Sequence, residues 1–130
     1  MPNQKVELMK YRLEMSQERI NSAKLLLDSG NYKDSIGRSY YAMFCAVRAI
    51  LALDGVDFSK HAGVISYFQK EYIKTMKIDK KYSGYISQAF QFRNNTDYAD
   101  FFVVSHKDAK EQYERAVEFL KAISEYVDQK

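Results

Sequence analysis

The feature that most constrains this fold is a long, almost uncharged run in the first half of the chain. Between Ser39 and Leu53, thirteen of the fifteen residues are apolar, and Arg48 carries the only charge. A helix that is apolar on nearly every side must be surrounded by protein or lipid. A membrane span needs about 20 apolar residues, so the run is too short to cross a bilayer. We expect a buried helix at the centre of a bundle and no membrane-spanning segment.

The composition favours a single all-α domain over residues 1–130. The chain has one proline and five glycines, so few positions would interrupt a helix. Its 46% hydrophobic and 28% charged residues are typical of a globular protein. No repeat, linker or strand pattern is present. The sequence therefore predicts an up-and-down helical bundle of four core helices plus one additional helix.

Apolar spacing and capping residues set the expected helix boundaries. Gly30 suits a left-handed helix end, and Asn31, Ser59, Asp79 and Ser105 are candidate N-caps. The third helix is expected to pack at one side of the other four. The five predicted helices are Val6–Asp28, Tyr32–Leu53, His61–Met76, Lys80–Asn94 or Asn95, and Lys107–Val127.

The longest irregular stretch is expected at Asn94–Val104. An exposed loop should not hold four consecutive apolar residues, Phe101 to Val104, without a packing partner. We expect them to pack over the bundle or against another subunit.

Several classes of site are excluded by the residues present. The single cysteine, Cys45, rules out an internal disulfide framework and a multi-cysteine metal site. It lies in the apolar run, which favours an inert core residue over a nucleophile. The chain has no HExxH, P-loop or GxGxxG motif, so we expect no metal site and no cofactor. The N-terminus lacks the pattern of a signal peptide, and we expect a cytoplasmic protein.

A polar cluster, Phe92–Tyr98, ends the predicted fourth helix. Arg93 and Asp97 are four residues apart and can pair on one helix face, as can Asn94 and Tyr98. The planar guanidinium of arginine suits phosphate or carboxylate. A helix-end ion pair with a capping asparagine would explain the same spacing, so both interpretations stay open.

The net charge of +3 is concentrated in the middle of the chain. Lysines such as Lys70 and Lys74 recur at helical spacing and alternate with tyrosines, a pattern that could bind phosphates and stack bases. A solvated lysine face beside core tyrosines explains it too. His61 and His106 each stand alone at a predicted helix start, which is typical of a solvated or hydrogen-bonded histidine.

Four stretches together resemble the HEPN family over roughly residues 31–127. They are RSYYAMFCAVRAIL from Arg38, KHAGVISYFQKEYIKT from Lys60, FRNNTDYADF from Phe92, and the closing AKEQYERAVEFLKAI helix. The resemblance implies an α-helical bundle that forms a homodimer. In active members, an Arg-x4–6-His motif from each subunit faces a shared cleft and cuts RNA without a metal. Many members are toxins paired with a minimal nucleotidyltransferase antitoxin, which can add adenylate to a tyrosine near the motif.

The chain departs from that pattern at the histidine. Arg93 matches the motif arginine, but Tyr98, Ala99 and Asp100 stand where the histidine is expected, and His106 is too distant. Loss of a general acid–base group typically costs about 10²–10⁴-fold in rate. The resemblance therefore implies binding of RNA, a nucleotide or a partner protein without efficient turnover.

In this reading Arg93 anchors an anion, Asp97 orients Arg93, and Tyr98 stacks on the ligand or donates its hydroxyl. Asn94 and Asn95 would orient a phosphate or ribose. The alternative is an active metal-independent endoribonuclease toxin in which Tyr98 or His106 replaces the histidine. Two further possibilities are Tyr98 as the adenylate acceptor, and a motif that only stabilises the dimer.

Overall fold

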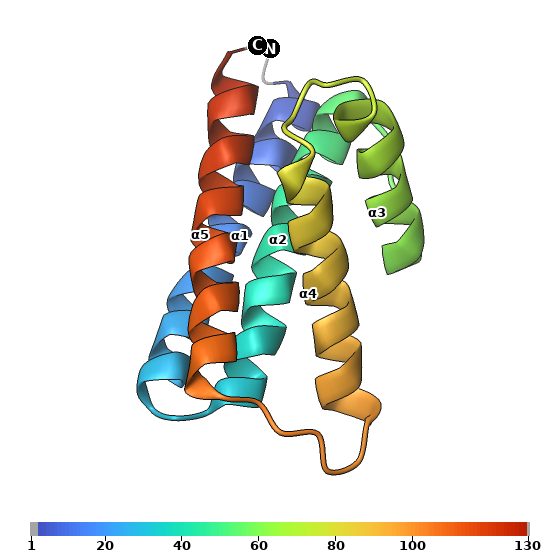
Figure 1. Ribbon diagram of the computed structural model, residues 1–130. Coiled ribbons are helices and arrows are strands. Elements are labelled where there is room, and N and C mark those ends of the chain that lie inside the picture. The colour runs from blue at the N-terminus through green and yellow to red at the C-terminus, as the bar shows by residue number, and fades with distance from the viewer. Residues whose placement is uncertain (1–2, 130) are drawn as a thin grey trace.

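The computed structural model describes residues 3–129, and within that range it contains no β-strand. Figure 1 shows α1, α2, α4 and α5 running up and down beside one another, with α3 at one side. The predicted all-α bundle of four core helices and one additional helix is confirmed. Its elements are α1 (Gln4–Asp28), α2 (Tyr32–Asp54), α3 (His61–Phe68), the π-helical turn η1 (Gln69–Ile73), α4 (Lys81–Tyr98) and α5 (His106–Asp128).

Helix α2 is the central element of the bundle. It contacts α1, α3, α4 and α5. One face of α2 carries bulky apolar residues and another carries small ones. Both faces are buried because neighbouring helices cover them. Cys45 is the exception on the small face, since it is only half-buried. The buried residues of the two faces are Tyr40, Phe44, Val47 and Leu51, and Ala42, Ala46, Ala49 and Ala52.

Length and composition alone would let α2 cross a membrane. Its most apolar window has a mean hydropathy of 1.2, and 67% of that window is buried inside the bundle. The apolar run alone is too short to span a membrane, but the helix that contains it is longer and extends from Tyr32 to Asp54. This burial is what a core helix requires, so the apolar character of α2 is explained by packing.

Helices α1 and α2 form an antiparallel hairpin (Figure 1), as the short connection between them requires. Gly30 has φ of +83°, the left-handed conformation expected at the end of α1. Two buried serines join the helices: Ser16 donates to the Ala42 carbonyl at 2.6 Å, and Ser35 to the Ala23 carbonyl at 2.8 Å. Asn31 does not cap α2 with its side chain, because its amide donates to the Ser29 hydroxyl instead.

The third helix is interrupted, which the sequence analysis did not predict. The α-helix ends at Phe68 and a π-helical turn follows. A π turn aligns residues five apart, and Tyr67 and Tyr72 both donate to the same carboxylate oxygen of Asp54 at the end of α2. This shared acceptor favours the wider turn. Ser59 is not the N-cap of α3, a position that Lys60 occupies without a side-chain bond.

Helix α4 runs to Tyr98, beyond the predicted end at Asn94 or Asn95. The Arg93–Asp97 ion pair explains the extra turn, because two side chains four residues apart meet only if the backbone is helical as far as Asp97. The irregular stretch is therefore shorter than expected. Lys80 rather than the predicted Asp79 is the N-cap of this helix, although the Asp79 carboxylate accepts from the backbone N–H of Lys81 at 2.9 Å.

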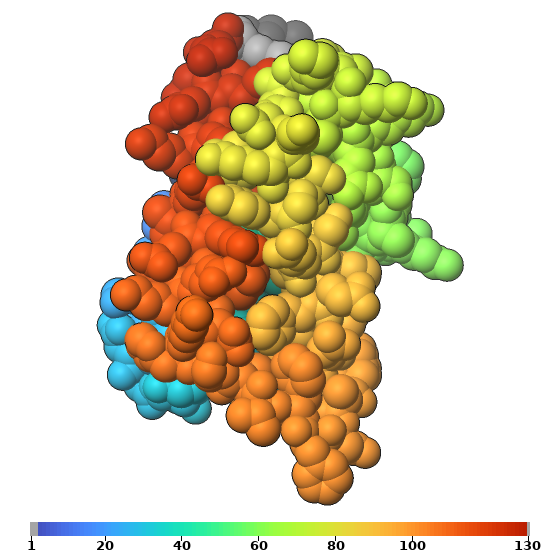
Figure 2. All heavy atoms as spheres, in the orientation of Figure 1, coloured from blue at the N-terminus to red at the C-terminus, as the bar shows by residue number. Residues whose placement is uncertain are grey.

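The segment between α4 and α5 divides its apolar residues between two environments. Phe102 packs edge-on against Phe92, and Val104 is buried near Leu27. Phe101 and Val103 are 99% and 83% exposed. The segment projects from the lower end of the molecule (Figure 2). Packing over the bundle is thus correct for two of the four residues.

Helix α5 starts at the predicted cap. The Ser105 hydroxyl accepts from the Asp108 backbone at 3.0 Å, and the Asp108 carboxylate accepts from the Ser105 backbone at 3.3 Å. Apolar spacing predicts that its inward face consists of Ala109, Tyr113, Ala116, Val117, Leu120, Ile123 and Val127. All of these are buried except Val117, which is 40% exposed, and half-buried Tyr113. Gln112 and Phe119, which lie outside that set, are also buried.

The close packing of α2 gives a direct stability test. Ala46 is fully buried, so Ala46→Leu should overpack the core and lower the free energy of unfolding by about 1–3 kcal/mol. The matched control is Ala62→Leu at an exposed position of α3, where the extra methyl groups meet solvent. Urea denaturation measures both changes. Equal stability of the two variants would contradict the central position of α2.

Candidate functional site

Arg93 is held in a fixed position on α4. Its Nε lies 3.0 Å from the Asp97 carboxylate, one helical turn along, and its Nη2 donates to the Tyr41 hydroxyl of α2 at 3.0 Å. The Arg93 side chain is 21% exposed. The predicted Arg93–Asp97 pair is confirmed, and Tyr41 is a second partner that spacing could not reveal, because it comes from another helix.

Two tyrosine rings of α2 lie beneath the guanidinium. Its central carbon is 5.1 Å from the ring centre of Tyr41 and 5.8 Å from that of Tyr40. Both distances are within the range of cation–π attraction. Among residues 3–129, no side chain or carbonyl pairs with Nη1 of Arg93. The group is therefore oriented by its neighbours and still has a donor nitrogen for a ligand.

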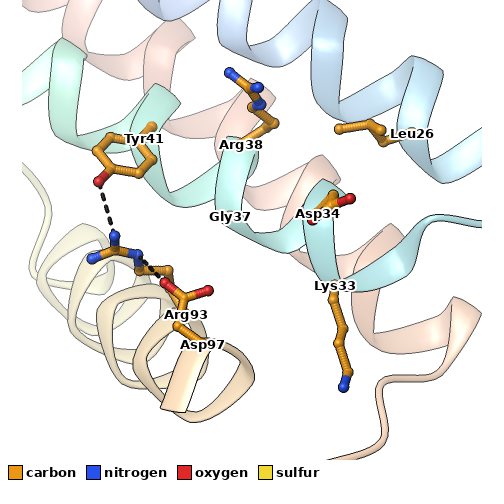
Figure 3. Close-up of a pocket in the computed structure, with 8 residues that line it drawn as sticks. All are labelled: Leu26, Lys33, Asp34, Gly37, Arg38, Tyr41, Arg93 and Asp97. Carbon is orange, nitrogen blue, oxygen red and sulfur yellow. Dashed lines mark hydrogen bonds and ion pairs between the residues drawn. The ribbon is translucent and has the colours of Figure 1, made fainter.

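A pocket of about 460 Å³ opens beside this arginine. Figure 3 shows Tyr41 and Asp97 pointing toward Arg93, and Arg38 extending away from it. Three cationic and two acidic side chains line the pocket, and one of the carboxylates already neutralises Arg93. The lining favours a small anion. It consists of Leu26, Lys33, Asp34, Gly37, Arg38, Tyr41, Arg93 and Asp97.

His61 joins the same cluster, although sequence analysis treated it as a solitary helix-start residue. Its ring stacks on Phe44 at 4.1 Å between centres, and its Nδ1 lies 2.8 Å from the Tyr40 hydroxyl. It was missed because α3 brings it beside Arg93 only in the folded bundle. The available signal was its place in the KHAG stretch that carries the family resemblance.

The protonation of His61 follows from its surroundings. Burial, and then the charges of Arg93 and Arg48, lower the pKa of His61. Burial raises the pKa of the Tyr40 hydroxyl well above its usual range, so that group keeps its proton. Within the described chain, His61 is the only partner of this hydroxyl. The hydroxyl therefore donates to Nδ1, and neutral His61 carries its hydrogen on Nε2.

The remaining predicted residues are distributed around the site. Asn94 is half-buried and Asn95 exposed, both on α4. Tyr98 ends α4 and is 78% exposed, outside the pocket lining. Lys70 and Lys74 are exposed on and after η1, also outside the lining. The structure therefore brings Arg93 and Asp97 together but does not place these other residues in the pocket.

His106 and Cys45 show no geometry for catalysis. His106 is exposed at the start of α5, with its ring edge-on to Tyr32 at 5.5 Å. Burial raises the pKa of the Cys45 thiol, which disfavours a reactive thiolate. Between Asn3 and Gln129, no three His, Cys, Asp or Glu side chains gather where they could hold a metal ion.

Comparison with known proteins identifies the fold family. The sequence model of the HEPN domain matches residues 9–129, nearly the whole chain. This chain belongs to the HEPN family. The match begins earlier than the resemblance noted above, so it includes most of α1.

Three relatives illustrate the family. A Thermotoga maritima protein named "UPF0332 protein" is 32% identical over 126 residues, which cover 97% of this chain and 96% of the relative. "UPF0332 protein PH1297" of Pyrococcus horikoshii is 37% identical over 83 residues, 64% of this chain and 58% of its own. "Putative toxin MJ0142" of Methanocaldococcus jannaschii is 30% identical over 115 residues, 88% of this chain and 78% of its own. This HEPN protein thus has relatives named as toxins.

The lowered pKa of His61 predicts a pH dependence of stability. Because the unfolded chain binds this proton more readily, the stability contribution of His61 is complete above its ordinary pKa of 6.5 and is lost as the pH falls through the folded-state value. His61→Gln keeps an acceptor for Tyr40 but does not titrate. Between about pH 7.5 and pH 5, thermal unfolding of the unmodified protein should therefore move to lower temperature by more than that of the variant. If the unfolding temperatures of the two proteins fall by the same amount over this pH range, the lowered pKa of His61 is contradicted.

Proposed function

We propose that this HEPN protein binds RNA or a nucleotide through a phosphate group in the pocket beside Arg93. The observation that carries the proposal is the state of that guanidinium: Asp97, Tyr41 and two aromatic rings fix it, and Nη1 is still available. A preorganised guanidinium loses little freedom when it bonds to phosphate. Lys33 and Arg38 add positive charge along the same pocket.

Binding without efficient cleavage is the better interpretation of this geometry. The motif histidine is absent, and with the Tyr40 hydroxyl as donor to Nδ1, the nearest imidazole, His61, presents an N–H rather than a lone pair. In that tautomer it can donate to a ribose or phosphate oxygen but cannot accept the proton of an attacking hydroxyl. Asp97 is committed to Arg93 and is a positioning residue in this proposal.

One observation favours the second candidate, a metal-independent endoribonuclease. His61 lies close enough to Arg93 for the guanidinium charge to affect its pKa. An imidazole and an arginine are the groups that such a reaction needs. If His61 exchanged tautomers when RNA binds, it could serve as the base in place of Tyr98 or His106.

The toxin names of relatives support a place for this protein as a toxin. A minimal nucleotidyltransferase is the antitoxin partner that the family resemblance implies, and we include it in the proposal. Tyr98 is the proposed acceptor of adenylate. Its 78% exposed ring follows Asp97 directly, so a modifying enzyme could reach it next to the pocket. A bulky anion on Tyr98 would stand beside the site of phosphate binding.

The proposal makes Arg93 the decisive residue for anion binding. Arg93→Ala should weaken binding of a labelled RNA oligonucleotide roughly tenfold to a hundredfold, the usual loss for a charge-assisted bond. The matched control is Arg115→Ala. Arg115 has the same kind of surroundings, with Glu111 at 2.9 Å and the Tyr85 ring at 4.9 Å, on the α5 side of the bundle.

Fluorescence anisotropy in EDTA measures this binding, and electrophoresis of the same samples detects cleavage. Equal affinity of Arg93→Ala and Arg115→Ala would refute the proposed site. RNA shortened by the unmodified protein but not by Arg93→Ala would establish the endoribonuclease in place of the binding protein.

We further propose a homodimer formed through the segment that follows α4. Phe101 and Val103, two residues apart in that segment, are 99% and 83% exposed. Phe101 also has φ of +60°, a conformation that is costly for a bulky residue. A strained and exposed aromatic ring is explained if a second subunit covers it.

Phe101→Asn tests the dimer without damaging the monomer. Asparagine tolerates a positive φ, so the variant should fold at least as stably, while losing the ring that the partner would cover. Met76→Asn is the matched control, since Met76 is also 86% exposed and has φ of +64°. Light scattering after size exclusion should show a weaker dimer for Phe101→Asn only. Identical masses for all three proteins would exclude this interface.

A further inference from the structure

A second group of arginines lies at the other end of α2. Arg12 of α1 and Arg48 of α2 both approach the same oxygen of Asp57, at 3.5 Å and 3.0 Å. Arg12 also donates to the backbone carbonyl of Arg48 at 2.8 Å, so its guanidinium is locked in place. The side chains of Arg12 and Arg48 are 12% and 35% exposed, and that of Asp57 is 50% exposed.

This group carries more positive charge than its surroundings neutralise. One carboxylate serves two guanidiniums, and burial together with the charge of Arg48 lowers the pKa of Arg12. The Nε of Arg48 is buried and has no partner within the described chain. Arg19 is half-buried and lies two turns from Arg12 on the same side of α1, and it forms no ion pair among residues 3–129. An anion bound here would relieve the repulsion.

The two arginine groups belong to one continuous face. Tyr41, which bonds Arg93, and Arg48 are seven residues apart on α2, so they lie two turns apart on one half-exposed side of that helix. The half-exposed ring of Tyr41 lies edge-on to His61 at 5.8 Å in the same interval. The far end of the face opens into a pocket of about 310 Å³ lined by Lys5, Arg12 and Asp57 among others.

From this arrangement we infer that the exposed flank of α2 is a track for a single-stranded polynucleotide. One phosphate occupies the Arg93 pocket, a base lies against Tyr41 and His61, and later phosphates reach Arg48, Arg12 and Arg19. A cationic pocket, one aromatic interval and a second cationic group suit a strand that presents phosphates on both sides of a stacked base. Guanidinium forks suit phosphate geometry, and an acidic peptide would leave the aromatic interval unused.

This inference rests on the proposed phosphate site at Arg93 and adds the class of ligand, a strand rather than a mononucleotide. It also assigns the track to the arginine face, defined by Arg12, Arg19 and Arg48. The lysine side at Lys70 and Lys74, the other basic surface considered, is excluded from it.

The test compares uridine monophosphate with an oligouridylate of about ten nucleotides, within the site sizes of single-strand binders. The oligonucleotide should bind more tightly and with a stronger salt dependence. Arg48→Gln and Arg19→Gln should each reduce the slope of log affinity against log salt by about 0.7, the value for one phosphate contact on a single strand. Neither variant should change the affinity for the mononucleotide. Arg19 has no ion pair to lose, so its variant is a test that does not depend on the Asp57 cluster.

Lys70→Gln and Lys74→Gln are the matched controls and should leave the salt slope unchanged. A mononucleotide that binds through Arg93, with an oligonucleotide that binds no more tightly, would overturn the track while the proposed function stands. Failure of both ligands to bind would overturn both. A reduced slope in the lysine variants alone would overturn the assignment of the face. Poly-glutamate that binds equally well, and with the same dependence on Arg48, would overturn the polynucleotide in favour of an acidic protein partner.

Discussion

The site depends on α2 being buried along most of its surface and half-exposed along one flank. Tyr40 and Tyr41 show the consequence at adjacent residues. Tyr40 points into the core and fixes His61 through its hydroxyl, while Tyr41 stays half-exposed and binds Arg93. Since both tyrosines belong to one rigid helix, α3 and α4 are positioned against the same two rings. A change in the rotation of α2 would therefore separate His61 from Arg93.

Local patterns account for the parts of this structure that sequence could predict. The apolar run identifies the core helix, and the Ser105–Asp108 capping box marks the start of α5 within one residue. The Arg93–Asp97 pair was predictable because both residues lie on one helix. Local sequence patterns do not predict the structure where contacts between different helices determine it. The π turn η1 follows α3 where Tyr67 and Tyr72 share the acceptor Asp54, and no spacing rule could foresee that contact.

Only the part of the site that lies within one helix, the Arg93–Asp97 pair of α4, was predicted. Tyr41 and His61 reach Arg93 from other elements, so their role needed the folded chain. The Arg12–Arg48–Asp57 group joins α1, α2 and a loop and was likewise invisible in the sequence. Charge counts drew attention to the lysine-rich middle instead, because composition records how many charges a segment has and not which of them lack a partner.

This chain belongs to the HEPN family but lacks the motif histidine, and under our proposal its arginine serves to bind an anion rather than to cleave RNA. The motif arginine is buried enough to be fixed and open enough to bind. The nearby imidazole is neutral and directed by a buried tyrosine, which suits recognition rather than proton transfer. The two arginine groups on one flank of α2 then give the protein a surface longer than one nucleotide needs.

The most direct test of this account is the NMR signal of the Arg93 Nε–H, assigned by its loss in Arg93→Lys. If the guanidinium is held by Asp97 and Tyr41 in a sheltered pocket, the signal should be resolved, slow to exchange with water, and shifted when inorganic phosphate is added. A signal that exchanges as fast as those of solvated arginines and does not respond to phosphate would contradict the account.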